Sequence, residues 1–192
     1  MTHAPSLART HAAAAGREVA LAVGASLFVA LCARLTLPLP FTPVPLTLQN
    51  FGVLVVGLAL GPRRAFAALV LYLLEGMAGA PVFNPTGPGG IAQLLGPTGG
   101  YLLAYPFVAA LAGALAGINR QRLSSALALA LAGSVLGEAL LFLSGVSWFM
   151  LVTRLPLGRA VEFALYPFVF AEIIKVLGAA ALAPRLARKL RL

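Results

Sequence analysis

Acidic residues are rare in this chain, and Asp is absent. Only 5 of its 192 residues are Asp or Glu, against 14 Lys or Arg. The chain also has 1 cysteine, Cys32, and 2 histidines, His3 and His11, which both lie near the N-terminus. A single cysteine excludes an internal disulfide, and so few ligands leave no basis for a transition-metal site. We therefore expect no metal and no other cofactor.

The short motifs of familiar enzymes are missing as well. The sequence has no P-loop, no Gly-x-Ser-x-Gly and no His-Glu-x-x-His pattern. It therefore indicates neither ATP hydrolysis by this chain nor a known catalytic site. No long internal repeat is present, which disfavours a carrier built from inverted repeats.

Apolar residues dominate what is present. Hydrophobic residues make up 60% of the chain and charged residues 10%, and long apolar runs recur from end to end. This pattern is typical of bilayer spans. We expect an all-α integral membrane protein, a bundle of six transmembrane helices. The predicted helices cover residues 18–37, 46–60, 64–78, 99–117, 123–143 and 162–183.

The basic residues gather in alternate connections between these helices. The larger set comprises Arg9, Arg17, Arg63, Arg64, Arg120, Arg122, Arg185, Arg188, Lys189 and Arg191. The connection after residue 143 has only Arg154 and Arg159. The positive-inside rule then places both termini in the cytoplasm. This distribution, rather than nucleic-acid binding, accounts for the net charge of +9.

Three regions follow from these patterns. Residues 1–17 are expected to form a disordered cytoplasmic leader, residues 18–184 the membrane domain, and residues 185–192 a basic cytoplasmic tail. The leader lacks the apolar core and cleavage site of a signal peptide, so we expect the first helix to be retained.

Residues 81–101, PVFNPTGPGGIAQLLGPTGGY, contain no formal charge and are rich in Gly and Pro. Glycine permits positive φ and proline fixes φ, so this backbone is bent and partly rigid. Non-helical backbone at membrane depth must be buried in protein or line a cavity, because lipid satisfies no N–H or C=O group. The segment is therefore interpreted as a structured cap over a ligand site that opens to the outside.

The five carboxylates divide into two groups. Glu18 and Glu162 begin predicted helices, where a negative charge suits the helix dipole. Glu75 lies beside the cap and Glu138 towards the middle of a predicted helix, and for both a structural and a functional role stay open. An ionised side chain in a helix interior is costly and usually functional.

The run YPFVFAEIIKV places Glu172 and Lys175 three residues apart within an otherwise apolar helix. This spacing puts both on one face. They form either a structural ion pair or a site that offers a carboxylate acceptor and an ammonium donor to a small polar ligand with a negative end.

Several longer motifs occur in one order along residues 21–183: PVPLTLQ, LGPRRA, LYLLEGMAGAPVF, LLGPTGGYLL, GVSWF and PFVFAEIIK. In this series the chain resembles the BioY family, the biotin-binding S-components of energy-coupling-factor (ECF) transporters. That family usually has Asp where this chain has Glu172, followed by the same spaced Lys. The resemblance implies that the role is kept with a carboxylate one methylene longer.

The resemblance implies a six-helix substrate-binding subunit in the bacterial cytoplasmic membrane, associated with a transmembrane coupling protein and two cytoplasmic ATPases. Biotin offers ureido N–H donors, a ureido carbonyl, an apolar bicycle and a valerate carboxylate. Asn84 and Glu172 are the candidates for the ureido N–H groups, and Lys175 for the ureido carbonyl or the carboxylate. The candidate walls and further polar contacts are Tyr101, Phe83, Trp148, Gln49, Thr47, Gln93 and Thr98.

Each of these assignments has an alternative. Trp148 and Tyr101 also fit an interfacial aromatic belt, and Gln49 or Thr98 fits a helix cap. In the first helix, Ala22, Ser26 and Ala30 recur every four residues as a small-residue ridge. Such a ridge serves either internal packing or, by the resemblance, docking of the coupling protein.

Two other functions remain as alternatives. One is a solitary biotin transporter that works without the coupling module. The other is an integral membrane enzyme that uses Glu138 or Glu172 as a general base on a lipid-soluble substrate. The motif series favours a binding subunit that is not an enzyme.

Overall fold

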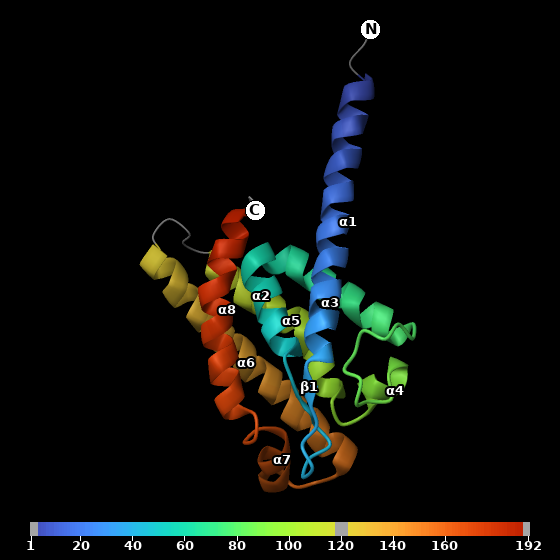
Figure 1. Ribbon diagram of the computed structural model, residues 1–192, viewed down its shortest axis with the longest axis vertical. Helices are drawn as coiled ribbons and strands as arrows, with labels where there is room; N and C mark the ends of the chain where they lie inside the picture. Colours follow the sequence, from blue (N-terminus) through green and yellow to red (C-terminus); the bar gives the residue numbers. More distant parts are fainter. Residues whose placement is uncertain (1–3, 118–122, 190–192) are drawn as a thin grey trace.

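The computed structural model describes residues 4–117 and 123–189, which form a helical bundle with one short β-hairpin (Figure 1). Its elements are α1 (Ala4–Arg34), β1 (Thr36–Leu37), β2 (Leu46–Thr47), α2 (Gln49–Leu60), α3 (Pro62–Met77), α4 (Gly90–Leu95), α5 (Gly99–Gly117), α6 (Leu123–Thr153), α7 (Leu157–Ala164) and α8 (Val169–Lys189). The two strands pair antiparallel, with Thr36 opposite Thr47.

The prediction of a mostly helical membrane protein is confirmed, but a count of six spans is not established. Within the described residues, three helical segments are long and apolar enough to cross a membrane: His11–Arg34, Gly99–Gly117 and Ala126–Thr153. A fourth span results if α7 and α8 are taken together, with a bend of 54° between them. Helix α2 has 12 residues, which extend about 18 Å against a hydrocarbon core of about 30 Å.

Four predicted helices differ from the observed ones. The helix predicted over residues 162–183 is two helices, α7 and α8, and Pro167 lies in the break between them. The helix predicted from residue 46 begins at Gln49, because Leu46 and Thr47 form β2. Helix α1 begins at Ala4 rather than at residue 18, so the segment expected to be a disordered leader continues the helix. Residues 12–15 are all Ala, the strongest helix former, and Figure 1 shows this end of α1 extending beyond the bundle. Helix α6 continues to Thr153 because its sequence contains no Pro. The expected positions of His3, Arg120, Arg122 and Arg191 lie outside the described residues.

Helix α5 packs against α2, α3 and α6. The contact with α2 depends on two glycines: a Cβ on Gly57 would collide with the Ala109 backbone, and a Cβ on Gly113 with the Gly57 carbonyl. The two backbones therefore touch directly, as small residues permit. This packing fixes the N-terminal turns of α2 and α5 at the same level of the bundle.

Both chain ends lie in the upper part of Figure 1, as does the junction between α2 and α3, whereas the β-hairpin and α7 lie at the lower end. This arrangement agrees with the gathering of basic residues at the termini and at Arg63 and Arg64. The orientation across the membrane stays a prediction.

Candidate functional site

A cavity lies where β2, the first turn of α2, residues 81–101, α5, α6 and α8 meet. The space between these elements that no protein atom fills is about 500 Å³, open solvent included. Its walls are formed by Val44, Pro45, Thr47, Gln49, Asn50, Asn84, Thr98, Tyr101, Leu102, Tyr105, Leu141, Phe142, Phe168, Glu172 and Lys175.

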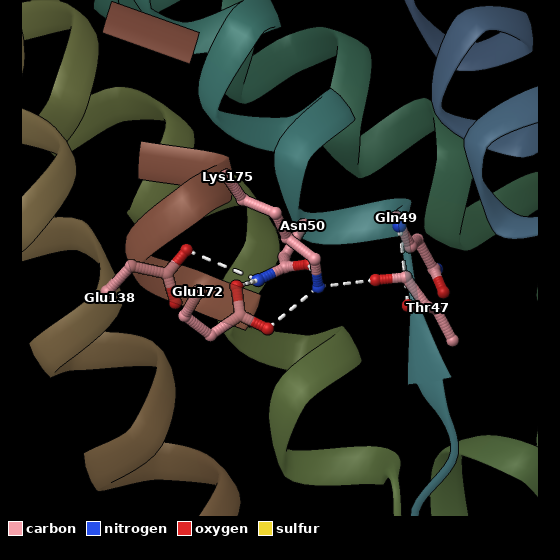
Figure 2. A network of polar contacts seen from close by, with 6 residues as sticks. All are labelled: Thr47, Gln49, Asn50, Glu138, Glu172 and Lys175. Atoms are coloured by element: carbon pink, nitrogen blue, oxygen red, sulfur yellow. Dashed lines mark hydrogen bonds and ion pairs between the residues drawn. The ribbon is translucent and has the colours of Figure 1, made fainter. Parts of the chain in front are cut away.

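The polar part of the cavity is centred on Lys175 of α8 (Figure 2). Its Nζ lies 2.7 Å from Glu172 Oε1, 2.9 Å from Asn50 Oδ1 and 2.5 Å from the Thr47 carbonyl. An ammonium has three N–H donors, so the protein uses all of them. The Lys175 and Glu172 residues are only 8% and 7% exposed. The predicted pair is therefore buried and fully hydrogen-bonded on its cationic side.

Asn50, in the first turn of α2, connects this pair to α6. Its amide nitrogen donates to Glu172 Oε2 and, at 3.2 Å, to Glu138 Oε1. Because an amide has two N–H donors, Asn50 has none left for a ligand. Each Glu172 oxygen accepts one of these bonds and has a second lone pair available, so Glu172 can still accept a hydrogen bond from a molecule in the cavity.

A second chain of hydrogen bonds connects the cavity to the Gly/Pro-rich segment. Gln49 Nε2 donates to the Tyr72 hydroxyl at 2.5 Å, and that hydroxyl donates to the Val82 carbonyl at 2.9 Å. Gln49 Oε1 has no partner among the described residues, and Gln49 lines the cavity. This side chain therefore has one acceptor available to a ligand.

The Gly/Pro-rich segment contributes Asn84, Thr98 and Tyr101 to the cavity wall. Asn84 is buried, and its Oδ1 accepts a hydrogen bond from the Thr86 hydroxyl at 2.8 Å. In the described part of the chain its Nδ2 has no protein partner. The segment turns at Gly89, where φ is 71°, a conformation that favours glycine, and then forms α4.

The apolar wall consists mainly of aromatic rings. Tyr101 of α5 and Phe142 of α6 meet edge to face, with ring centroids 6.3 Å apart. The Tyr101 hydroxyl donates to the Ala164 carbonyl, and the Thr42 hydroxyl donates to the Phe163 carbonyl at 2.8 Å. These two bonds satisfy carbonyls that the end of α7 leaves without helical partners. Phe168, in the break before α8, is thereby held against the cavity.

Residues 5–192 match the family model described as the BioY family. The chain belongs to the BioY family. It is 36% identical over 162 residues to the probable biotin transporter BioY of Pyrococcus horikoshii, which covers 84% of this chain and 92% of that protein. It is 34% identical over 163 residues to the biotin transporter BioY of Thermotoga maritima, with the same two coverages of 84% and 92%.

The fold is also similar to that of a solved S-component. A crystal structure of the S-component for biotin from an ECF-type ABC transporter aligns with a TM-score of 0.78 and 26% identity, over 90% of this chain and 91% of the other. The predicted BioY resemblance is therefore confirmed. Because the family consists of transporters, the alternative of a membrane enzyme is set aside.

Three residues predicted to contact the ligand of this BioY chain lie outside the cavity wall. Phe83 packs edge-on against Tyr72, with ring centroids 5.5 Å apart. The Gln93 side chain accepts a hydrogen bond from the Gly89 amide at 3.1 Å. The Trp148 indole nitrogen donates to the Gly96 carbonyl at 2.9 Å. All three hold the segment that forms part of the wall.

Sequence reasoning missed Asn50, the residue that connects three helices. It follows the PVPLTLQ motif directly, and a polar amide at the start of an apolar helix was the available signal. The other missed residues are apolar or aromatic, and nothing distinguishes them in the sequence from ordinary core residues: Val44, Pro45, Leu102, Tyr105, Leu141, Phe142 and Phe168.

The small-residue ridge of α1 faces the interior of the bundle. Ser26 is fully buried and donates a hydrogen bond to Glu75 of α3, while Ala22 and Ala30 are half-buried against the core. The ridge thus packs against α3. This contact favours a role of the ridge in internal packing over a role in docking of the coupling protein.

Proposed function

We propose that this protein binds biotin in the cavity between α2, α5, α6 and α8 and is the substrate-binding S-component of an ECF-type transporter in the bacterial cytoplasmic membrane. One observation carries the proposal. In a chain of the BioY family, the buried pair of Glu172 and Lys175 and an aromatic wall line the same cavity. Glu172 offers a charged acceptor to the polar ureido ring of biotin. The aromatic wall suits the apolar thioether ring.

The ureido ring of biotin matches the groups left free by the protein. Glu172 has a lone pair on each oxygen for a ureido N–H. Asn84 has a free Nδ2 for the ureido carbonyl and a second lone pair on Oδ1 for the other N–H. Lys175 acts through Glu172, whose charge and direction it fixes at 2.7 Å.

The bicycle and the valerate tail are placed by the apolar or charged character of each part of the cavity. The thioether bicycle lies against Tyr101, Tyr105 and Phe142, which give apolar contact area. The valerate carboxylate extends towards the open side of the cavity, because Lys175 is the only cation among the lining residues and its donors are all used.

Energy for uptake comes from partner subunits. The sequence contains no nucleotide-binding motif, so we assign ATP hydrolysis to two cytoplasmic ATPases that act through a transmembrane coupling protein. Both termini and the connection with Arg63 and Arg64 face the cytoplasm in this arrangement.

The test is a binding experiment with the purified full chain in lipid nanodiscs. Titration calorimetry should show saturable binding of biotin, equal with and without ATP and magnesium, and the bound biotin should be recovered unchanged. Lipoate is the matched control, because it shares the valerate tail and a sulfur ring but has no ureido group. Binding of lipoate as tight as that of biotin, or failure to bind biotin, would contradict the proposal.

Uptake distinguishes the coupled from the solitary mode. Cells that express this chain together with an ECF module should accumulate labelled biotin, and an ATPase-inactive module should abolish accumulation. Equal accumulation with the inactive module would instead support the solitary transporter.

A further inference from the structure

Glu138 of α6 is a buried carboxylate with almost no hydrogen bonding. The residue is 7% exposed and does not line the cavity. Its Oε1 accepts one bond, from Asn50 at 3.2 Å, and its Oε2 has no partner among residues 4–117 and 123–189. A buried carboxylate ion in this condition is costly, because burial removes water without supplying donors or a paired cation.

The charged and titratable groups that face Glu138 would not balance a negative charge on Glu138 in addition to the one on Glu172. Helix α8 contributes Glu172 and Lys175, and α5 contributes the neutral Tyr105. Helix α2 contributes the uncharged Asn50. Two carboxylates thus share one ammonium, and Lys175 directs its three donors to Glu172, Asn50 and Thr47.

The geometry distinguishes the two carboxylates. Glu172 has the ammonium at 2.7 Å and an amide donor on its other oxygen, so it is stabilised as an ion. Glu138 has a single amide donor. Ser134 lies one turn earlier on the same face of α6, is fully buried, and its hydroxyl also has no partner in the described part of the chain. A proton on Glu138 would provide a donor on this otherwise unpaired side.

We propose that Glu138 carries a proton in the ligand-free protein and acts through Asn50 as a positioning residue for Glu172. A neutral Glu138 accepts one Asn50 N–H and leaves the other directed at Glu172, while Lys175 stays with Glu172. An ionised Glu138 would compete for the same amide and the same ammonium, and would draw both away from the ligand acceptor. The effect on biotin rests on the function proposed above, whereas the proton itself does not.

Infrared spectroscopy of the ligand-free protein tests the proton directly. A protonated carboxyl group gives a C=O stretching band that is separate from the carboxylate bands. At neutral pH the parent should show this band, Glu138→Gln should lose it, and Glu75→Gln should retain it. Glu75 is the matched control, a carboxylate on α3 that is bonded to Ser26 outside the cavity. A parent spectrum unchanged by Glu138→Gln would overturn the inference whatever biotin does.

Biotin affinity tests the positioning role. Glu138→Gln keeps the shape and the acceptor for Asn50, so its affinity at neutral pH should stay within about threefold of the parent. Glu138→Leu removes the acceptor and should weaken binding at least about tenfold. The parent and Glu75→Gln should lose affinity as pH rises above neutral, and Glu138→Gln should have a flatter profile. A Gln variant as weak as the Leu variant, or identical pH profiles, would overturn the positioning role. Absence of biotin binding by the parent, with the infrared band present, would instead count against the proposed function alone.

Discussion

Glu172 and Lys175 lie one turn apart on α8, and their side chains meet at 2.7 Å while both residues stay below one-tenth exposed. The ammonium donates its two other hydrogen bonds to the Asn50 side chain and the Thr47 carbonyl, which are far away in the sequence. The pair is therefore one part of a network that joins α2 to α8. In this network Glu172 retains acceptor capacity and Lys175 retains no donor, which gives the two residues different roles.

Replacement of Lys175 by Met should weaken biotin and its uncharged amide by the same factor, at least about tenfold, which is roughly 1.4 kcal/mol. The substitution leaves Glu172 as a buried charge without its cation, and this disturbs the acceptor that both ligands use. Calorimetry with both ligands measures the effect. Arg159→Met, which breaks an exposed ion pair with Glu162 on α7, is the control and should bind as the parent does. A loss for biotin with little loss for the amide would show that Lys175 meets the valerate.

Glu172→Gln should also weaken biotin at least about tenfold, because it replaces a charged acceptor with an amide whose N–H₂ confronts a donor. Leaving a buried donor without its acceptor costs about 1–3 kcal/mol. Glu162→Gln supplies an exposed control. A folded double variant of Glu172 and Lys175 that bound biotin with parental affinity would show that the pair is only structural.

Trp148→Phe should weaken biotin by less than about tenfold and loosen residues 81–98. The change removes the indole donor to the Gly96 carbonyl but no atom of the cavity wall, and one hydrogen bond contributes about 0.5–1.5 kcal/mol. Amide hydrogen exchange should be faster in α4 and its flanks than in the parent. Unchanged exchange there would contradict a supporting role for Trp148.

Cysteine labelling should establish the orientation across the membrane. A cysteine at Thr86, which is exposed, should react with an impermeant thiol reagent added outside intact cells. Cysteines at Arg63 and at Gln121, which lies outside the described residues, should react only after the cells are opened. The native Cys32 is buried and contributes little background. The reverse pattern would refute the positive-inside assignment.

The positions of most helices could be predicted from the apolar runs. A helical segment that crosses a bilayer must be apolar, which gives a strong pattern in the sequence. The three-residue spacing of Glu172 and Lys175 likewise predicted a shared face, which the structure has. The role of Asn50 was beyond such reasoning, since its partners lie 88 and 122 residues away and only tertiary packing brings them together. The break between α7 and α8 was missed although Pro167, which lies in it, was an available signal, because proline tends to end or kink a helix.

The network that joins Thr47 and Asn50 to Lys175 spans 128 and 125 residues of sequence. During synthesis, α2 and α6 are therefore complete before α8 exists, and until then Asn50 lacks its two partners on α8, Glu172 and Lys175. The binding site closes only when the last helix inserts beside α2. The cavity is accordingly complete only in the finished chain, and a chain truncated before α8 would leave Asn50 without these two partners inside the membrane.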